Sequence, residues 1–470
     1  MSFISPEFCF VALVFFIIYW YLKPYFAIQK SYLTVASYLF YASWSIKFTC
    51  ILFVYSFFIW VMGKWIKTNA LIAPSQKLKL SIAICLSLGL LLMTKYYEFI
   101  REIFDDILHS IGVTYQLPYL EVIIPAGISF FTFQAITYLV WQNKNESPDI
   151  KQQITFVDVL LYLAFWPTLF AGPIFRAKAF FEQLYGPLVG AAIHVEKAMY
   201  FILLGLLQKM VLANWLSTSF VDEVFAYPAQ QNLLTVSSGA WAYALQIFFD
   251  FSGYTLLVTG LGLLLGYQVP INFRQPYLAK NLQEFWKRWH ISLSSFIRDY
   301  IYIPLGGNKY SFTRTQVNIF IAMTLSGIWH GANLTFIYWG MLHALGVIFI
   351  NVNNQYVKIK IPLGLAHFLT LVFICITWVF FRSDNLDNAI NLFQQLTHVT
   401  GNFNVSHLLL ILLSALFFIF SKRAEVIEQY CILQIQKWWG WRLCLVITTS
   451  IYLIIYAGPS GIPAFIYYRF

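Results

Sequence analysis

The sequence predicts an all-α, polytopic membrane protein, and two observations support that prediction. Of its 470 residues, 60% are hydrophobic and only 11% are charged, whereas a soluble domain carries roughly 25% charged residues. The apolar residues also gather in long runs that short loops separate, without a linker or a low-complexity tract. We therefore expect one continuous membrane domain over residues 1–470 rather than several soluble domains.

Each apolar run is interpreted as a candidate helix, because a transmembrane helix needs roughly 20 mostly apolar residues. The first run lacks a basic start and a small-residue cleavage site, which predicts a retained helix rather than a removed signal peptide. Several runs are too short to cross alone, and the second holds either one long helix or two short ones. In chain order the ranges are residues 8–21, 32–62, 80–96, 122–141, 157–171, 198–216, 239–265, 317–329, 336–350, 363–381, 408–420 and 443–457.

The net charge of +10 lies mostly in the loops between these runs. The positive-inside rule expects basic residues there, so the charge indicates membrane orientation and gives no support to nucleic-acid binding. Loops 64–79, 274–314 and 358–360 are rich in lysine or arginine and should face the cytoplasm. The acidic loops around residues 98–121 and 222–223 should face outward.

Residues 317–350 begin and end beside basic loops, so both ends should lie on the cytoplasmic side. This region should enter and return as two short arms, with the turn near Gly331-Ala332-Asn333 and His330 close to the membrane interior. The count of membrane crossings gives the same result around residues 157–173, so TLFAGPI at 168–174 should re-enter the membrane as irregular backbone. Such backbone is tolerated at depth only where protein or a water-filled cavity covers it.

Residues 284–298 fit one amphipathic helix along the cytoplasmic boundary, with tryptophans inward and cations toward the headgroups. A simple membrane anchor is the alternative, although an anchor has no need of an imidazole on its buried face. The buried face would hold Trp286, Trp289, His290, Leu293, Phe296 and Ile297, and the polar face Glu284, Lys287, Arg288, Ser295 and Arg298.

His330 is the strongest candidate for a catalytic group. A free imidazole titrates near pH 6.5, so a neutral one can accept a proton at physiological pH. Trp329 would shape a pocket, and Gly331 would let backbone or substrate approach closely. The alternative is a core histidine hydrogen-bonded between helices. His343 is a second-tier candidate, because it lies close to His330 in sequence.

Asp250 lies in the apolar run FFDFSGY (248–254), and a carboxylate at membrane depth is by default a functional hypothesis. It could orient a histidine or pair with a cation such as Arg298, and a purely structural buried pair is the alternative. Arg298 and Asp299 precede YIYIPLGGN, whose glycine pair is interpreted as a turn or as a phosphate cradle. The six cysteines are scattered without zinc-ligand spacing, so no metal site is expected.

Taken together, the motifs resemble those of membrane-bound O-acyltransferases, and most of all the integral-membrane subunit of bacterial alginate O-acetyltransferases. YIPLGGNK and the WHGAN ending favour that branch over the relatives that move D-alanine onto teichoic acids. One departure, YLVWQNKNE at 138–146, bears on which polymer is served. The motifs are PAGISFFTFQAITYLV (125–140), AGPIFRAKAF (171–180), FFDFSGY, the segment 272–308 with FWKRWHIS, SGIWHGAN (326–333), WVFFRS (378–383) and FIYYRF (465–470).

The resemblance implies a ring of about eleven transmembrane helices around a thin centre, with funnels from both faces meeting near His330. Acetyl-CoA would be the donor substrate, docking on the cytoplasmic side past His290, and no cofactor would stay bound. On this interpretation His330 activates the acceptor hydroxyl and His290 helps to position the thioester. Supporting roles would fall to Asp250, Arg298, Trp329 and Trp289, and donor-side roles to Lys287, Arg288 and Asp299.

The resemblance also implies a bacterial inner-membrane enzyme that contacts lipid and serves a periplasmic SGNH-type partner, which modifies a polysaccharide acceptor. Three alternatives stay open: D-alanyl transfer from a carrier protein to teichoic acid, a transporter or flippase, and a scaffolding subunit. The transporter would use the buried histidine and aspartate as a proton relay.

Overall fold

The computed structural model describes residues 6–67, 75–115, 117–120, 124–144, 146–186, 194–438 and 440–457, and the elements that it places there are helices. The chain divides into two compact units. Unit 1 contains residues 1–195 and 261–270, and unit 2 contains residues 196–260 and 271–470. The motif FIYYRF at 465–470 and the first two residues of the candidate range 122–141 lie outside the described residues.

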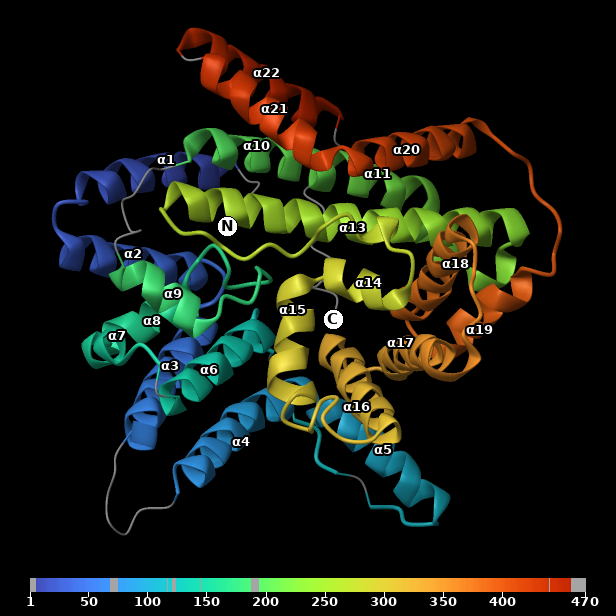
Figure 1. Cartoon of the computed structure of the whole chain (residues 1–470), viewed down its shortest axis with the longest axis horizontal. Coiled ribbons are helices and arrows are strands. Elements are labelled where there is room, and N and C mark those ends of the chain that lie inside the picture. Colours follow the sequence, from blue (N-terminus) through green and yellow to red (C-terminus); the bar gives the residue numbers. More distant parts are fainter. Residues whose placement is uncertain are drawn as a thin grey trace. The chain divides into compact units, whose positions relative to one another are not determined.

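Unit 1 is built from a succession of helices that are joined mostly by short turns (Figure 1). The candidate range 32–62 divides between two of them, because the chain turns at residues 43–45. The helices are α1 (Pro6–Tyr21), α2 (Phe26–Ala42), α3 (Ile46–Lys67), α4 (Gln76–Lys95), α5 (Tyr97–Ser110), α6 (Ile128–Asn143), α7 (Pro148–Gln153), α8 (Phe156–Ala164) and α9 (Ala177–Tyr185).

Unit 2 begins at Glu196, the second residue of a continuous helical stretch from Val195 to Ala226, in which π-helical segments interrupt the α-helix. That stretch consists of α10 (Val195–Leu206), η1 (Leu207–Ala213), α11 (Asn214–Leu216), η2 (Ser217–Val221) and α12 (Asp222–Ala226). The following elements are η3 (Pro228–Gln230), α13 (Leu233–Leu264), η4 (Pro276–Leu278), α14 (Leu282–Arg288), α15 (Ile291–Ile297), η5 (Arg298–Tyr302), α16 (Phe312–His330), α17 (Leu334–Val352) and η6 (Asn353–Val357). The end of α13, from residue 261 on, belongs to unit 1.

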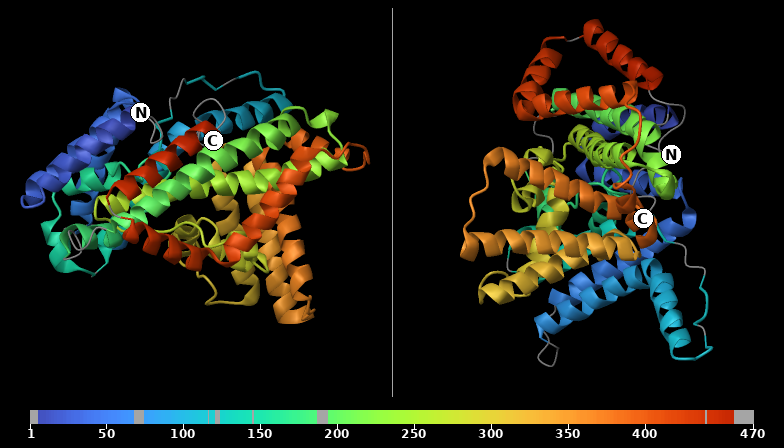
Figure 2. Two further views of the ribbon diagram at one scale, coloured as in Figure 1. Left: turned by 90° about the horizontal axis from the view of Figure 1, so that it is seen from above. Right: turned by 90° about the vertical axis from the view of Figure 1, so that its right-hand side faces the viewer.

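The last part of unit 2 contains α18 (Leu363–Arg382), α19 (Leu386–Gln395), α20 (Val405–Lys422), α21 (Ala424–Lys437) and α22 (Trp441–Ala457). Helices α20, α21 and α22 follow one another through short connections and change direction at each (Figure 2).

Among the described residues, seven helices are long and apolar enough to cross a membrane. They confirm a helical, multi-pass membrane protein, while the expected ring of about eleven spans stays a prediction. Two shorter apolar helices, at residues 10–21 and 441–456, are further candidates. The seven are residues 46–67, 76–95, 195–226, 233–264, 334–357, 363–382 and 405–422.

The stretch 165–176, between α8 and α9, is non-helical and almost wholly buried. Because buried backbone groups need partners, its packing explains why it is stable. Tyr162 donates its hydroxyl to the Phe175 carbonyl at 2.8 Å. Gly127 has a positive φ of 79°, and a Cβ there would lie 2.4 Å from the Leu169 carbonyl oxygen. Only glycine fits that position, and the predicted irregular, protein-covered backbone is confirmed.

Helices α16 and α17 form an antiparallel hairpin, and its turn falls at residues 331–333 as predicted. The arms are longer than the short arms expected from hydropathy, with 19 residues each, because polar residues at the start of α16 also join the helix. The two backbones touch: a Cβ on Gly327 would lie 2.3 Å from the Phe336 carbonyl oxygen and 3.0 Å from the Cα of Gly340.

Candidate active site

The single helix predicted over residues 284–298 is wrong, because the chain breaks at His290. Helix α14 ends at Arg288 and α15 begins at Ile291, and the two run in different directions (Figure 1). His290 itself has φ 44° and ψ 53°, the left-handed region. A residue other than glycine is uncommon there, although histidine is among those that are enriched. The break turns the imidazole into the protein instead of leaving it along a helix face.

The neighbouring segment 272–274 holds this break from both sides. The Arg274 amide donates to the Arg288 carbonyl at 3.0 Å, just before the break. Just after it, the Ile291 amide donates to the Asn272 carbonyl at 2.9 Å. The Ser292 amide donates to Oδ1 of Asn272 at 3.2 Å. These bonds satisfy backbone groups that an uninterrupted helix would have satisfied internally.

His330 is the last residue of α16 and is buried, with 4% of its surface exposed. Aromatic side chains from three helices surround its ring. The ring centroids of Trp329, Trp339 and Phe381 lie 4.9, 5.1 and 5.1 Å from it. His330 is thus buried within the protein, where aromatic rings form its walls, while its depth in the membrane stays a prediction.

Trp329 lies between the two principal candidate histidines. Its ring centroid is 6.2 Å from that of His290 and 4.9 Å from that of His330. His290 is also in edge contact with Phe251 of α13, at 4.7 Å between centroids. The structure therefore brings His290 and His330 into one aromatic cluster through Trp329.

His343 of α17 extends the same cluster. Its ring lies 4.9 Å from Trp339, which also contacts His330. Its Nε2 is 3.0 Å from the hydroxyl of Thr377, which donates to the Ile374 carbonyl at 2.9 Å. Because that hydroxyl proton is already committed, the geometry favours Nε2–H of His343 as the donor to Thr377. The histidine that sequence proximity ranked second therefore lies in the same aromatic cluster as His330.

Asp250 forms a buried ion pair with Lys209, a residue that the sequence reasoning missed. Lys209 lies in the π-helical segment η1, and both side chains are almost wholly buried. Such segments often occur at functional sites. The sequence does contain a signal for Lys209, because a lysine inside the apolar range 198–216 is an ionisable group at membrane depth. Asp250 also directly precedes Phe251, which contacts His290.

The suggested pairing of Asp250 with Arg298 does not occur. Arg298 instead holds its neighbour Asp299 through two hydrogen bonds of 2.7 and 3.2 Å, at an exposed position. The ion pair and hydrogen bond to Asp299 raise the pKa of Arg298. These two residues lie at the surface of η5, apart from the Lys209–Asp250 pair.

The other sequence candidates divide between surface and core. Lys287 is exposed, and Arg288 is half-buried with a 2.6 Å ion pair to Glu284. Trp289 is fully packed among aromatic rings that include Phe273 and Trp378, at 5.0 and 5.1 Å. Trp289 thus lies in the aromatic core that supports the break at His290. Lys287 and Arg288 lie at the end of α14 and face away from that core.

A groove of about 210 Å³ runs between α14, α15, η5, α16 and α17. Arg298 stands at its wall, and Ala322 and Ser326 of α16 line it. Residues spaced four apart share one helix face, so the lining face of α16 continues directly to His330. Trp286 lines the groove and contacts the ring of Trp339, which in turn contacts His330.

Burial of the His290 imidazole lowers its pKa to about 3. His290 lies outside the seven candidate spans. The ring is therefore neutral at physiological pH and can donate from one nitrogen and accept at the other. Among the described residues, no group of three histidine, cysteine, aspartate or glutamate side chains could hold a metal ion.

Comparison with protein families matches residues 75–383 to the MBOAT, membrane-bound O-acyltransferase family. The probable alginate O-acetylase AlgI of Pseudomonas aeruginosa is 33% identical, over 84% of this chain and 74% of its own length. The peptidoglycan O-acetyltransferase of Helicobacter pylori is 31% identical, over 79% and 74%. The teichoic acid D-alanyltransferase of Streptococcus thermophilus is 31% identical, over 50% of this chain and 58% of its own length.

Proposed function

Because the chain belongs to the membrane-bound O-acyltransferase family, we propose that it moves an acetyl group from cytoplasmic acetyl-CoA to a hydroxyl of a cell-envelope polymer or exopolysaccharide. Similarity to O-acetyltransferases of alginate and peptidoglycan, over most of the chain, supports an acetyl donor and a polysaccharide acceptor. The buried His330, at the end of the helix face that lines the groove, carries the assignment of the site.

In the proposed reaction the acceptor oxygen attacks the thioester carbonyl, the new C–O bond forms and the C–S bond breaks. His330 takes the hydroxyl proton as general base and returns it to the leaving thiolate, so that CoA leaves as a free thiol. Walls of aromatic side chains keep bulk water away and limit hydrolysis of the thioester.

The groove is the proposed path of the donor. Arg298 lines the groove, and the segment 274–314 holds seven basic residues against two acidic ones. Lys287 and Arg288 would attract the phosphates of CoA. Neutral His290 would position the thioester, with the Lys209–Asp250 pair and Trp329 supporting its surroundings. Asp299 would hold Arg298 in place.

The proposed setting is the bacterial cytoplasmic membrane, with a periplasmic SGNH-type partner passing the acetyl group to the polysaccharide. D-alanyl transfer to teichoic acid is the second candidate, because the teichoic acid D-alanyltransferases match about half of this chain. Family membership weighs against a transporter or a passive scaffold.

The test of the proposed function uses purified protein, radiolabelled acetyl-CoA and a polysaccharide acceptor. His330→Gln should reduce acetyl transfer by a factor of about 100 or more, the usual range of a positioned general base, while the protein still accumulates in membranes. His109→Gln, at an exposed histidine at the end of α5, is the control and should keep full activity. Transfer by His330→Gln above about a tenth of wild type would rule out the general-base role. Transfer of D-alanine from a charged carrier protein, without acetyl transfer, would favour the second candidate.

A further inference from the structure

Two cavities lie along one helix hairpin of unit 1, formed by α1 and α2. The larger, about 410 Å³, is lined by apolar and aromatic side chains of both helices and by Trp166. The smaller, about 280 Å³, lies near the connection between the two helices and includes Lys23 and Gln29.

The cavities succeed one another along the hairpin. Phe15 lines the larger cavity and Tyr19 the smaller, one helical turn further on α1, which is about 6 Å. Their rings stack at 5.8 Å between centroids, and Phe15 also stacks on Tyr32 of α2 at 5.3 Å. The hairpin therefore carries an apolar stretch that leads directly into a polar end.

The polar end is anchored to the rest of unit 1 by Tyr19 and Trp20. Tyr19 donates its hydroxyl to the Leu265 carbonyl at 3.0 Å, and Trp20 donates its indole N–H to the Leu264 carbonyl at 3.0 Å. Gln29, almost fully buried, donates to the Tyr19 carbonyl at 2.9 Å. These three hydrogen bonds fix the positions of the side chains that line the polar cavity.

A second cation, Lys30, lies close to two of the side chains that line the polar cavity. The ammonium of Lys30 lies 5.4 and 5.5 Å from the ring centroids of Phe26 and Tyr185, and both rings line the cavity. Lys30 also pairs with Oδ1 of the fully buried Asp158 at 2.7 Å. An ammonium has three protons, so this pair leaves others for a ligand.

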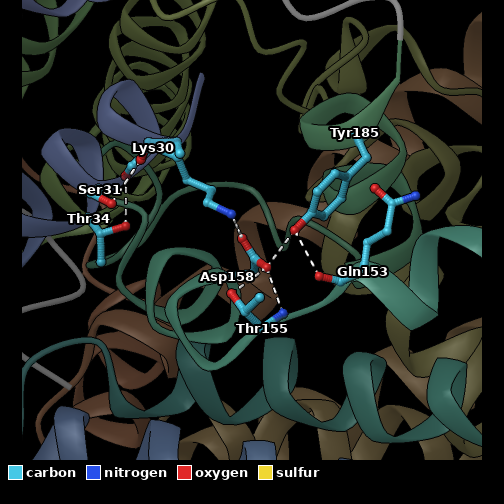
Figure 3. Close-up of polar contacts among 8 residues, drawn as sticks. Lys30, Ser31, Thr34, Gln153, Thr155, Asp158 and Tyr185 are labelled. Carbon is cyan, nitrogen blue, oxygen red and sulfur yellow. Dashed lines mark hydrogen bonds and ion pairs between the residues drawn. The ribbon is translucent and has the colours of Figure 1, made fainter. Parts of the chain in front are cut away.

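Hydrogen bonds from neutral donors stabilise the carboxylate of Asp158 at its other oxygen. Oδ2 accepts hydrogen bonds from the Thr155 amide and hydroxyl, both at 2.7 Å, and from the Tyr185 hydroxyl at 2.5 Å (Figure 3). Burial raises the pKa of Tyr185, and the Asp158 charge raises it further, so that hydroxyl stays protonated and neutral. Among the described residues at this end, Lys23 and Lys30 stand against the carboxylate of Asp158, so the formal charges of these three side chains sum to +1.

We propose that this hairpin binds one anionic phospholipid. A fatty acyl chain would lie in the apolar cavity, and the phosphate would lie at the polar end, between Lys23 and Lys30. The basic loop 64–79 that follows α3 should be cytoplasmic. The proposal takes α2 and α3 as one crossing and its return, which places the α1–α2 connection on the same side. The headgroup then belongs to the inner leaflet, with Tyr19 and Trp20 at the depth that such aromatic residues prefer.

The experiment is native mass spectrometry of the full chain in a neutral detergent, titrated with phosphatidylglycerol or phosphatidylcholine. We expect one phosphatidylglycerol bound per protein and weaker phosphatidylcholine binding. Lys23→Gln should weaken phosphatidylglycerol binding about fivefold, the equivalent of about 1 kcal/mol per basic residue near an anionic surface. Ala36→Trp, which fills the apolar cavity, should abolish binding of both lipids.

Matched controls are Lys77→Gln and Ala27→Trp, at exposed positions on α4 and α2 outside both cavities. Both should bind as wild type does. Val35→Trp, at an exposed lining position, replaces Ala36→Trp if that variant does not accumulate. Equal binding of the two lipids would overturn the headgroup assignment. Equal thermal stabilisation by inorganic phosphate, or unchanged lipid binding in the variants, would overturn the proposal.

Discussion

His290 combines two properties that separate it from a surface anchor: a left-handed backbone and a buried, neutral imidazole. His330 ends a helix that also lines the groove, and aromatic rings surround it. At the scale of single residues, the two histidines therefore differ in how they are held. His290 depends on a break that another segment clamps, whereas His330 depends on a hairpin turn.

This difference leads to separable kinetic effects. His290→Ala should raise the apparent KM for acetyl-CoA, because a residue that positions the donor contributes ground-state binding. His330→Ala should lower kcat with the donor KM little changed, because a base acts in the transition state. The measurement is acetyl-CoA titration at saturating acceptor. Equal losses of kcat with unchanged KM in both variants would show that the two histidines act as one unit.

The buried His290 also predicts how stability depends on pH. Its pKa is about 3 in the folded protein and near 6.5 when exposed, so the unfolded chain binds more protons between these values. Its contribution to stability is therefore present above pH 6.5 and is lost as the pH falls toward 3. Between pH 7.5 and 5, wild type should lose about 2 kcal/mol more than His290→Gln.

Thermal unfolding of both proteins in detergent, at several pH values, measures this difference. Ala27→Trp provides a variant with all histidines intact and should follow wild type. Parallel pH profiles of wild type and His290→Gln would contradict the buried neutral state of His290.

At the scale of elements, the sequence predicted the hairpin but missed the break. The basic residues on both flanks and the Gly-Ala-Asn sequence were enough to place the α16–α17 turn, because both signals can be recognised in the local sequence. No glycine or proline marks residues 284–298, and the break at His290 comes from hydrogen bonds to Asn272 and Arg274. Such tertiary contacts override a helical pattern that is locally consistent.

The same limit applies to the ion pairs of the site. The cost of burying a carboxylate singles out Asp250 in the sequence, but its pairing with Lys209 depends on how η1 packs against α13, which the sequence pattern does not specify. Trp339 and His343 are four residues apart on α17, so their contact follows from helix periodicity. The contact of Trp339 with His330 depends instead on how α16 and α17 pack, which periodicity does not specify.

The close packing of the α16–α17 hairpin gives a prediction for Gly327. A Cβ there would meet backbone atoms of α17 at 2.3 to 3.1 Å, and backbone cannot move aside as a flexible side chain can. Gly327→Ala should therefore destabilise the protein by about 1–3 kcal/mol, as overpacking usually does, and reduce activity through His330. Gly89→Ala is the control, since nothing lies within 4 Å of a Cβ at that helical position.

In the control, alanine's better helix propensity should raise stability by up to about 1 kcal/mol. Melting temperatures of the two variants in detergent measure the contrast. Equal melting temperatures would mean that α16 and α17 do not approach as closely as the glycine pair indicates.

At the scale of the whole molecule, the orientation in the membrane decides from which side each substrate arrives. The basic loop 274–314 lies beside the groove that we assign to the donor, so the donor should enter from the cytoplasm. Asp222 and Arg382, whose side chains are 3.5 Å apart, mark a region that the acidic loops predict to face outward. The chemistry proposed for His290 and His330 depends on this sidedness.

Single cysteines in a background without the native cysteines test it. Lys309→Cys should react with a membrane-impermeant thiol reagent only after the cells are opened, because the positive-inside rule places its loop in the cytoplasm. Asp222→Cys should react in intact cells, since its side chain is 46% exposed at an end of the 195–226 span. Both variants should keep acetyl transfer, which shows that the labelled protein is the folded one. The reverse labelling pattern would invert the topology, and the groove would then open toward the acceptor rather than toward acetyl-CoA.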